Sequence, residues 1–181
     1  MTTRHLTCGL IVVAMVLLTR SDAHAIAYIP AIPDNRTVLP ANDGEPDGCN
    51  SSRFKCVMGG WAVLDIQTGL TWARNADLAG KKMSWKDAEI FCQDIEIFNR
   101  KGWRLPSRNQ IITLLDTSQS SPALPAGHPF KNVGTIGSIY WTSTEQKGDK
   151  DIVWIVKMKL GIVTEYLKIF GAYAWPVLGS N

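Results

Sequence analysis

The stretch KGWRLPSRNQIITLLD, residues 101–116, decides how this chain is expected to fold. Ser107 is followed three residues later by Gln110, which is the pattern of a capping box: the Ser107 hydroxyl accepts the amide of Gln110, and the Gln110 side chain accepts the amide of Ser107. Pro106 disfavours helical geometry at Leu105, so the chain enters this cap in an extended form. The stretch therefore predicts a joint between an extended segment and a helix.

Two helices are predicted around this joint. After the cap, Ile111, Leu114 and Leu115 recur at helical spacing and are expected to bury the second helix, which begins its exit at Asp116. Upstream, Ser84 stands at the N-cap position of the first helix. That helix is expected to end between residues 99 and 102. Its buried face is expected to carry Trp85, Ala88, Cys92 and Ile95.

Strand patterns surround the helices. WAVLD (61–65) and LTWAR (70–74) flank the turn IQTG, which predicts a β-hairpin. Residues 117–138 form a long loop rich in Ser, Pro and Gly, and loops of this kind often carry function. Four β-rich runs follow it: SIYWTST (138–144), DIVWIVKMKL (151–160), IVTEYLKI (162–169) and AYAWPV (172–177). The order of hairpin, two helices and a mostly antiparallel sheet predicts an α+β fold.

The first 58 residues differ in composition from the rest of the chain. Residues 1–25 combine a short apolar run, Leu10–Leu18, with the small-x-small pattern Ala23-His24-Ala25, so they are expected to be a signal peptide for export. Residues 26–58 are rich in Pro, Gly and Asn and are predicted to be a loosely packed arm that cannot alternate into a sheet, closed by a Cys49–Cys56 disulfide. Residues 59–181 are expected to form one domain.

The net charge is modest. The chain has 19 Lys and Arg against 16 Asp and Glu, and loss of the signal peptide leaves 17 against 15. Such a balance is compatible with an anionic partner without requiring one. We expect no nucleic-acid partner and no membrane span after signal cleavage, and the sequence leaves the oligomeric state open.

Six motifs in a fixed order resemble a known family. They are AVLDIQTGLTW (62–72), SWKDAEIFC (84–92), KGWRLPSRNQIITLLD (101–116), LPAGHPFKNV (124–133), YWTST (140–144) and YAWPV (173–177). Together they resemble the Lcl C-terminal domain family over residues 59–179. The resemblance implies a C-type-lectin-like fold with a curled sheet and a long loop. It also implies an anionic or sulfated polysaccharide as ligand, since the founding member of the family binds sulfated glycosaminoglycans.

One departure from the family pattern concerns Cys92. The family commonly ends in Trp-Cys-Val-Arg, whereas Trp175 is followed here by Pro176. In C-type-lectin-like folds the cysteine of the first helix often pairs with one on the final strand, so the resemblance implies that Cys92 has lost this partner. Cys92 is then either a buried free thiol or is recruited by Cys56. We favour the free thiol, because a buried cysteine behaves as a small hydrophobe.

Candidate site residues divide into two groups. Trp103 and Arg104 could contact a sugar or sulfate, but we favour a structural role for them, with the indole in the core and the guanidinium paired across the joint. Trp72, Trp141, Trp154 and Trp175 are likewise expected to be mostly buried. The structural group comprises Trp103, Arg104, Leu105, Pro106, Ser107, Gln110 and Trp141. The residues predicted to bind a ligand are Arg100, Lys101, Arg108 and His128.

The residues give little support to an enzyme or a metal site. His128 is the only histidine after the signal peptide, and no nucleophile motif accompanies it. The three remaining cysteines form no Cys-x-x-Cys pair, and Asp116 is the only carboxylate beside the long loop, where calcium would need several. We therefore expect no catalytic residues, no metal and no cofactor.

Two functions remain. The first is an exported, periplasmic or extracellular binding domain that recognises an anionic polysaccharide or cell-surface ligand through the long loop and neighbouring strands. The alternative is a structural or assembly module that docks another envelope protein.

Overall fold

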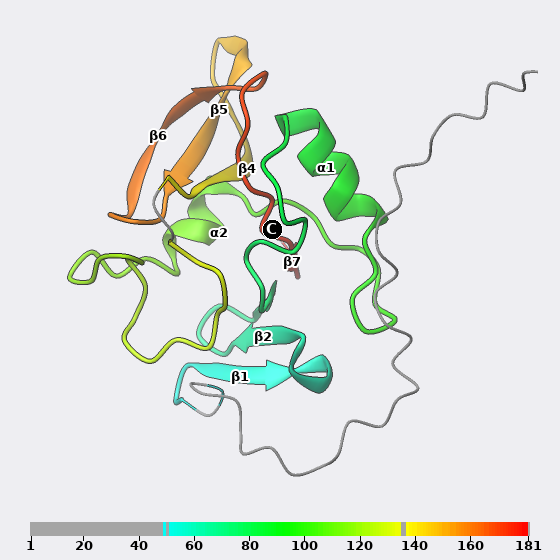
Figure 1. Ribbon diagram of the computed structural model, residues 1–181, viewed down its shortest axis with the longest axis vertical. Helices are drawn as coiled ribbons and strands as arrows, with labels where there is room; N and C mark the ends of the chain where they lie inside the picture. Colours follow the sequence, from blue (N-terminus) through cyan, green and yellow to red (C-terminus); the bar gives the residue numbers. More distant parts are fainter. Residues whose placement is uncertain (1–48, 50, 135–136, 181) are drawn as a thin grey trace, which may run out of the picture. The chain divides into compact units, whose positions relative to one another are not determined.

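The predicted joint and hairpin lie within a fold of two helices and two antiparallel sheets (Figure 1). The computed structural model describes residues 49, 51–134 and 137–180. The predicted signal peptide and residues 26–48 of the arm lie outside the described residues. The elements are β1 (Phe54–Val57), a 3-10 turn η1 (Met58–Gly60), β2 (Ala62–Asp65), β3 (Leu70–Ala73), α1 (Trp85–Asp94), α2 (Arg108–Ile112), β4 (Ile139–Gln146), β5 (Asp149–Lys157), β6 (Ile162–Leu167) and β7 (Val177–Leu178).

The first sheet has the strand order β1-β2-β3-β7 and is antiparallel throughout. The predicted hairpin is confirmed, because β2 and β3 pair with Val63 opposite Trp72. Its turn closes where the Gly69 amide donates to the Asp65 carbonyl at 2.8 Å, with Gly69 in the left-handed region at φ 71°. Glycine suits this position because it has no Cβ to clash with the following carbonyl.

The second sheet has the order β4-β5-β6, and the residues between β6 and β7 return the chain to the first sheet. The α+β class is confirmed, and three of the four β-rich runs predicted after the long loop form this antiparallel sheet, whereas the fourth does not belong to it. The run 172–177 was predicted as a strand, yet only Val177 belongs to one. Pro176 in this run cannot donate a ladder hydrogen bond. Tyr140 forms an isolated bridge with Tyr173, and Met83 with Ala172, so the run connects the sheets by separate contacts.

Each helix begins at the predicted cap. The Ser84 hydroxyl accepts the amide of Asp87 at 3.3 Å. α1 ends at Asp94, five residues before the earliest end predicted, because Ile95 is extended at φ −67° and ψ 141°. The chain then turns at Phe98 and Asn99, both with positive φ. α2 begins with the full capping box between Ser107 and Gln110, as predicted.

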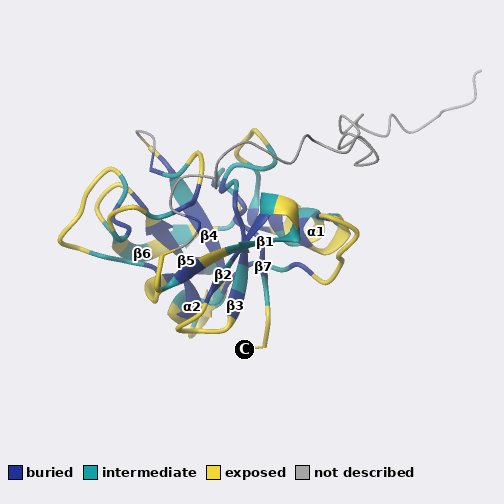
Figure 2. Ribbon diagram, turned by 90° about the horizontal axis from the view of Figure 1, so that it is seen from below, coloured by how far each residue is buried: buried dark blue, intermediate teal, exposed yellow. Residues whose placement is uncertain are grey.

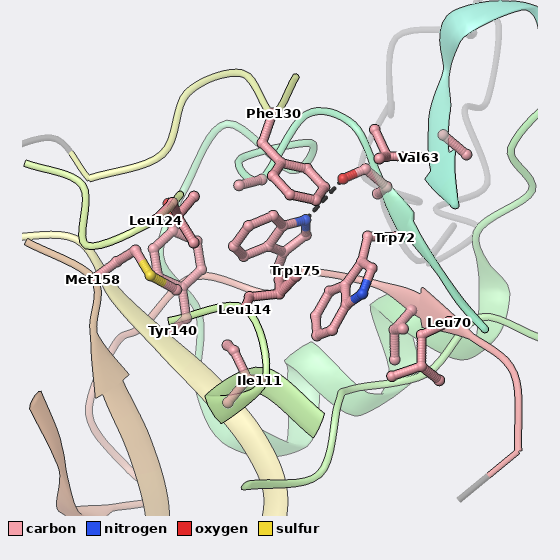
Figure 3. Close-up of a cluster of buried hydrophobic side chains, with 14 of the residues drawn as sticks. Val63, Leu70, Trp72, Ile111, Leu114, Leu124, Phe130, Tyr140, Met158 and Trp175 are labelled. Carbon is pink, nitrogen blue, oxygen red and sulfur yellow. Dashed lines mark hydrogen bonds between the residues drawn. The ribbon is translucent and has the colours of Figure 1, made fainter. Parts of the chain in front are cut away.

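A cluster of aromatic side chains forms the core beside both sheets (Figure 3). Trp175 lies at its centre, with ring centroids 5.4 Å from Trp72, 5.0 Å from Phe130 and 5.5 Å from Tyr140. The Trp175 indole donates to the Ala73 carbonyl at 2.8 Å, which satisfies its only polar atom. Burial along the strands is seen in Figure 2. The prediction of mostly buried tryptophans is confirmed for Trp72, Trp141 and Trp175, whereas Trp154 is partly exposed.

The end of the predicted arm belongs to the first sheet. Residues 54–57 form β1 and pair with β2, so the expectation that residues 26–58 cannot join a sheet is wrong for these four. Two interactions hold β1 in place. Phe54 packs edge-on against Phe130 at 5.3 Å, and the Arg53 guanidinium makes two hydrogen bonds, 3.1 and 2.8 Å long, to the fully buried carboxylate of Asp65.

Breaking the Arg53–Asp65 pair is expected to destabilise this sheet. Arg53→Ala leaves the Asp65 carboxylate buried without its counter-charge, which costs about 3 kcal/mol of unfolding free energy. Lys86→Ala is the matched control, because it breaks an exposed ion pair with Glu89 and costs about 0.5 kcal/mol or less. Urea unfolding followed by tryptophan fluorescence measures both. Equal midpoints for the two variants would contradict this account.

Candidate functional site

Arg104 anchors the joint to the final strand. Its backbone exchanges two hydrogen bonds with Val177, at 3.1 and 2.9 Å. Its guanidinium donates to the carbonyl of Gly179 at 2.7 Å, to that of Leu105 at 3.1 Å and to Gln110 Oε1 at 2.9 Å. Burial lowers the pKa of Arg104 from its ordinary value, yet an arginine stays charged in a protein. Arg104 is therefore a structural residue, and its partners are carbonyl and amide oxygens.

Gln110 connects three parts of the chain through one buried amide. Its Oε1 accepts from the Ser107 amide at 2.9 Å as well as from Arg104. Its Nε2 donates to the carbonyl of Ser180 at 3.1 Å. The capping residue of α2, the joint and residues 177–180 are thus held by the same side chain.

Of the other residues of the predicted structural group, Trp103, Leu105, Pro106 and Trp141 are buried and Ser107 is partly buried. The indole of Trp103 donates to the carbonyl of Arg100 at 2.8 Å, and that of Trp141 to the carbonyl of Met83 at 2.8 Å. Leu105 and Pro106 are buried, and the Pro106 carbonyl accepts from the Ser143 amide of β4 at 2.8 Å. This stretch is scaffold that positions its neighbours.

The four basic residues of this segment have separate environments. Arg104 makes the carbonyl contacts described above, and the Arg108 guanidinium stacks over the Trp154 ring of β5, 3.9 Å from its centroid. Lys101 lies 3.5 Å from the Glu96 carboxylate, with both side chains exposed. Arg100 is exposed, and its side chain makes no hydrogen bond or ion pair with any described residue. The four basic side chains therefore share no common partner among the described residues.

Arg100 borders a concavity of the described chain. This hollow of ≈460 Å³, called here the Phe98 hollow, lies where η1, the β2–β3 turn, the turn after α1 and β7 meet. Its apolar lining comes from Met58, Phe98 and Leu178, its polar lining from Thr71, Asn99 and Arg100, and backbone from Gly69 and Gly179. The size lies within the ~300–1,000 Å³ typical of small-molecule sites.

A strained turn presents Phe98 and Asn99 at the hollow. Ile97 and Arg100 exchange backbone hydrogen bonds of 3.1 and 3.0 Å, while Phe98 and Asn99 between them have φ of 51° and 58°. Positive φ at both central residues is the pattern of a type I′ turn, which Asn and Gly favour and a bulky residue does not. Each non-glycine residue in this conformation lowers the free energy of unfolding by about 1–3 kcal/mol, and backbone strain of this kind concentrates at functional sites.

The Phe98 ring is held at the rim by close packing. A Cβ at Gly59 would lie 3.0 Å from Phe98 Cε2, so the ring rests on a backbone that has no side chain there. Even so, 46% of Phe98 is exposed. An exposed aromatic ring, an uncommitted guanidinium and side-chain amide and hydroxyl groups together suit a ligand with an apolar face, hydroxyl groups and a negative charge.

The structure does not bring the remaining predicted ligand residue to this hollow. His128 lies against Phe130, with ring centroids 5.9 Å apart, and its buried Nδ1 has no hydrogen-bond partner in the described chain. Burial lowers its pKa from the ordinary value, so the imidazole is neutral at pH 7 and adds no positive charge. The described part of the long loop supplies core residues, Leu124 and Phe130 among them, and no lining residue of the hollow.

Sequence reasoning identified Arg100 but missed Phe98, Asn99, Met58 and Leu178. The first helix was expected to continue to residue 99 or beyond, which placed Phe98 and Asn99 within a helix. The sequence carries only a weak signal that Phe98 and Asn99 lie in a turn after the helix. Asn tolerates the left-handed region, but Phe gives no such indication.

The cysteines are divided between a bond and a buried thiol. Cys49 and Cys56 form a disulfide at the start of the described chain. Cys92 is free and fully buried, and burial, together with the nearby charge of Glu89, raises its pKa to about 12. A thiol of this kind is protonated and unreactive at neutral pH.

Within residues 49, 51–134 and 137–180, no three His, Cys, Asp or Glu side chains gather as metal ligands would. The two helices of this part of the chain are also too short to cross a membrane.

These observations define an α+β domain with an aromatic core and a small hollow lined by residues of η1, β3, β7 and neighbouring turns. Residues 61–178, more than half of the chain, match the Lcl C-terminal domain, and the chain belongs to the Lcl C-terminal domain family. No curated protein matches it.

The buried thiol gives a direct prediction. In the folded protein after removal of residues 1–25, iodoacetamide at pH 8 is expected to leave Cys92 unmodified, because the thiolate fraction is small and the sulfur is inaccessible. In guanidinium chloride without reductant, one alkyl group is expected, on Cys92. Mass spectrometry of both samples measures this, and rapid labelling of the folded protein would contradict the buried position.

Proposed function

We propose that this chain is an exported, non-enzymatic binding domain of C-type-lectin-like fold that recognises an anionic polysaccharide outside the cytoplasm. The observation that carries the proposal is the uncommitted Arg100 guanidinium beside the exposed Phe98 ring in one hollow. The ligand class is the one that the family resemblance suggests. Two sheets and two helices are compatible with the fold assignment.

The charge distribution favours binding of a polyanion at a local basic site over attraction by the net charge of the whole protein. The formal charge after signal cleavage is small, with 17 basic and 15 acidic residues, so long-range attraction to a polyanion is weak. Arg100 is exposed, and it lies next in sequence to Lys101, whose own charge is only partly balanced by an exposed Glu96. Binding is then expected to weaken as salt screens these charges.

The chemistry of the candidate nucleophiles supports a non-enzymatic role. The Cys92 thiol is buried and protonated, and the other two described cysteines are joined in a disulfide. His128 lies against Phe130 of the core, with a lowered pKa. Neither arrangement supplies an activated nucleophile with an adjacent base.

Export is supported by the disulfide. Structural disulfides persist in oxidising compartments and are rare in the reducing cytosol. The Cys49–Cys56 bond therefore agrees with the signal peptide expected at residues 1–25, and with a periplasmic or extracellular location.

A second function, docking to another envelope protein, is favoured by one observation. Exposed apolar side chains lie in β6 and in the segments at both of its ends, and Ile169 is 79% exposed. The β6 strand is the outer strand of its sheet, and an edge with apolar side chains is a surface on which proteins pair. The residues are Leu160, Ile162, Leu167, Ile169 and Phe170.

Heparin chromatography tests the first function. The protein without residues 1–25 is expected to be retained at low salt and to elute as salt rises. The double variant Arg100→Ala, Lys101→Ala is expected to elute at clearly lower salt than the unmodified protein, because it removes the positive charges at the hollow.

The matched control is Lys147→Ala, Lys150→Ala, which removes two exposed charges at the β4–β5 turn. If elution depends on total charge alone, both double variants shift equally and the site is not specific. Passage of the unmodified protein through the column at low salt would contradict polysaccharide binding and favour the docking function.

A further inference from the structure

We infer that the Phe98 hollow binds a single acidic sugar unit, with one face of the pyranose ring on Phe98 and the acid group on Arg100. This inference rests on the proposed function and deepens it, since it names the site and the unit recognised. The acid group is a carboxylate or a sulfate, two oxyanions that a guanidinium binds in the same forked geometry.

Phe98 provides the apolar surface. The face of an aromatic ring is electron-rich, so it attracts the polarised C–H groups on the face of a sugar, as it attracts cations. The ring is partly exposed and supported from behind by Gly59, so a ligand meets a fixed surface. Phe98 is thus more accessible to a ligand than Phe54 and Phe130, which are buried in the core.

Arg100 provides the charge. Its backbone is fixed by the exchange with Ile97 and by the Trp103 indole, which donates to its carbonyl at 2.8 Å. Its side chain has no partner among the described residues, so binding an acid breaks no existing ion pair. Thr71 and Asn99 line the same hollow and can pair with sugar hydroxyl groups.

The size of the hollow sets the length of ligand that it holds. A volume of ≈460 Å³ is near the lower end of the ~300–1,000 Å³ range for small-ligand sites, which suits one ring or two and not a longer stretch of polymer. Recognition in the hollow is therefore expected to depend on the chemistry of the unit, whereas chain length adds affinity through repeated encounters.

The left-handed turn makes the site rigid before the ligand arrives. Met58, Phe98 and Asn99 all border the hollow with φ between 51° and 58°. Folding has already fixed these conformations, so binding does not have to order them, and preorganisation of this kind raises affinity. The strain is retained at the residues whose side chains would contact the sugar.

The test is a titration of ¹⁵N-labelled protein, without residues 1–25, with a fully sulfated uronate-containing disaccharide. Amide shifts are expected in segments 58–60, 69–71, 97–101 and 178–180. An unsulfated uronate disaccharide and a sulfated disaccharide without a carboxylate identify the acid group that Arg100 binds. A neutral disaccharide is expected to cause much smaller shifts.

Three variants separate the ring, the charge and the fold. Phe98→Asn removes the ring, and asparagine is favoured in a type I′ turn, so the turn is kept. The affinity for the acidic disaccharide is expected to fall at least about tenfold. Arg100→Gln is expected to lower affinity by a similar factor for the acidic disaccharides only. Phe98→Trp is expected to retain binding, because it keeps an aromatic ring at this position. Lys147→Ala is the control, because it alters neither the aromatic ring nor the positive charge at the hollow.

Two outcomes distinguish this inference from the proposed function. If the protein is retained on heparin and Phe98→Asn changes neither retention nor disaccharide affinity, the hollow is not the site and the inference fails alone. If the protein passes through heparin but the disaccharide shifts the four segments, the polymer function fails and the sugar site stands. Shifts centred on Arg108 and Trp154 would also overturn the inference.

Discussion

The buried amide of Gln110 is the constraint on which the described fold depends most. Its oxygen accepts hydrogen bonds from the Ser107 amide and the Arg104 guanidinium, while its nitrogen donates to the carbonyl of Ser180. A side-chain amide in this position must have all of its partners, because an unsatisfied buried polar group costs about 1–3 kcal/mol. The start of α2, the extended joint and residues 177–180 are thereby fixed relative to one another.

This constraint links scaffold and site. The Arg104 guanidinium holds the Gly179 carbonyl, and Leu178 and Gly179 form one wall of the Phe98 hollow. On the other side of the joint, the Trp103 indole holds the carbonyl of Arg100. The residues that look most like ligand contacts in the sequence, an indole and a guanidinium side by side, are therefore supports. The proposed contacts are the neighbouring side chains that they position.

Local chemistry made much of this fold predictable from the sequence. The capping box at Ser107, the cap at Ser84 and the β2–β3 hairpin depend on residues only a few positions apart, and the structure has all three. What could not be predicted depends on distant contacts. β1 forms because Arg53 meets the buried Asp65, and two sheets arise because residues 172–176 make only isolated bridges. The hollow was hidden for the same reason: segments far apart in the sequence meet there, and the bulky Phe98 adopts a turn conformation that its own preference opposes.

The most direct test of the Gln110 constraint is hydrogen–deuterium exchange of Gln110→Ala beside the unmodified protein. The account predicts faster exchange at the amides of Arg104 and Val177, which bond each other's carbonyls, and unchanged exchange in α1, which has its own cap. Equal protection of residues 103–108 and 177–180 in the two proteins would contradict it.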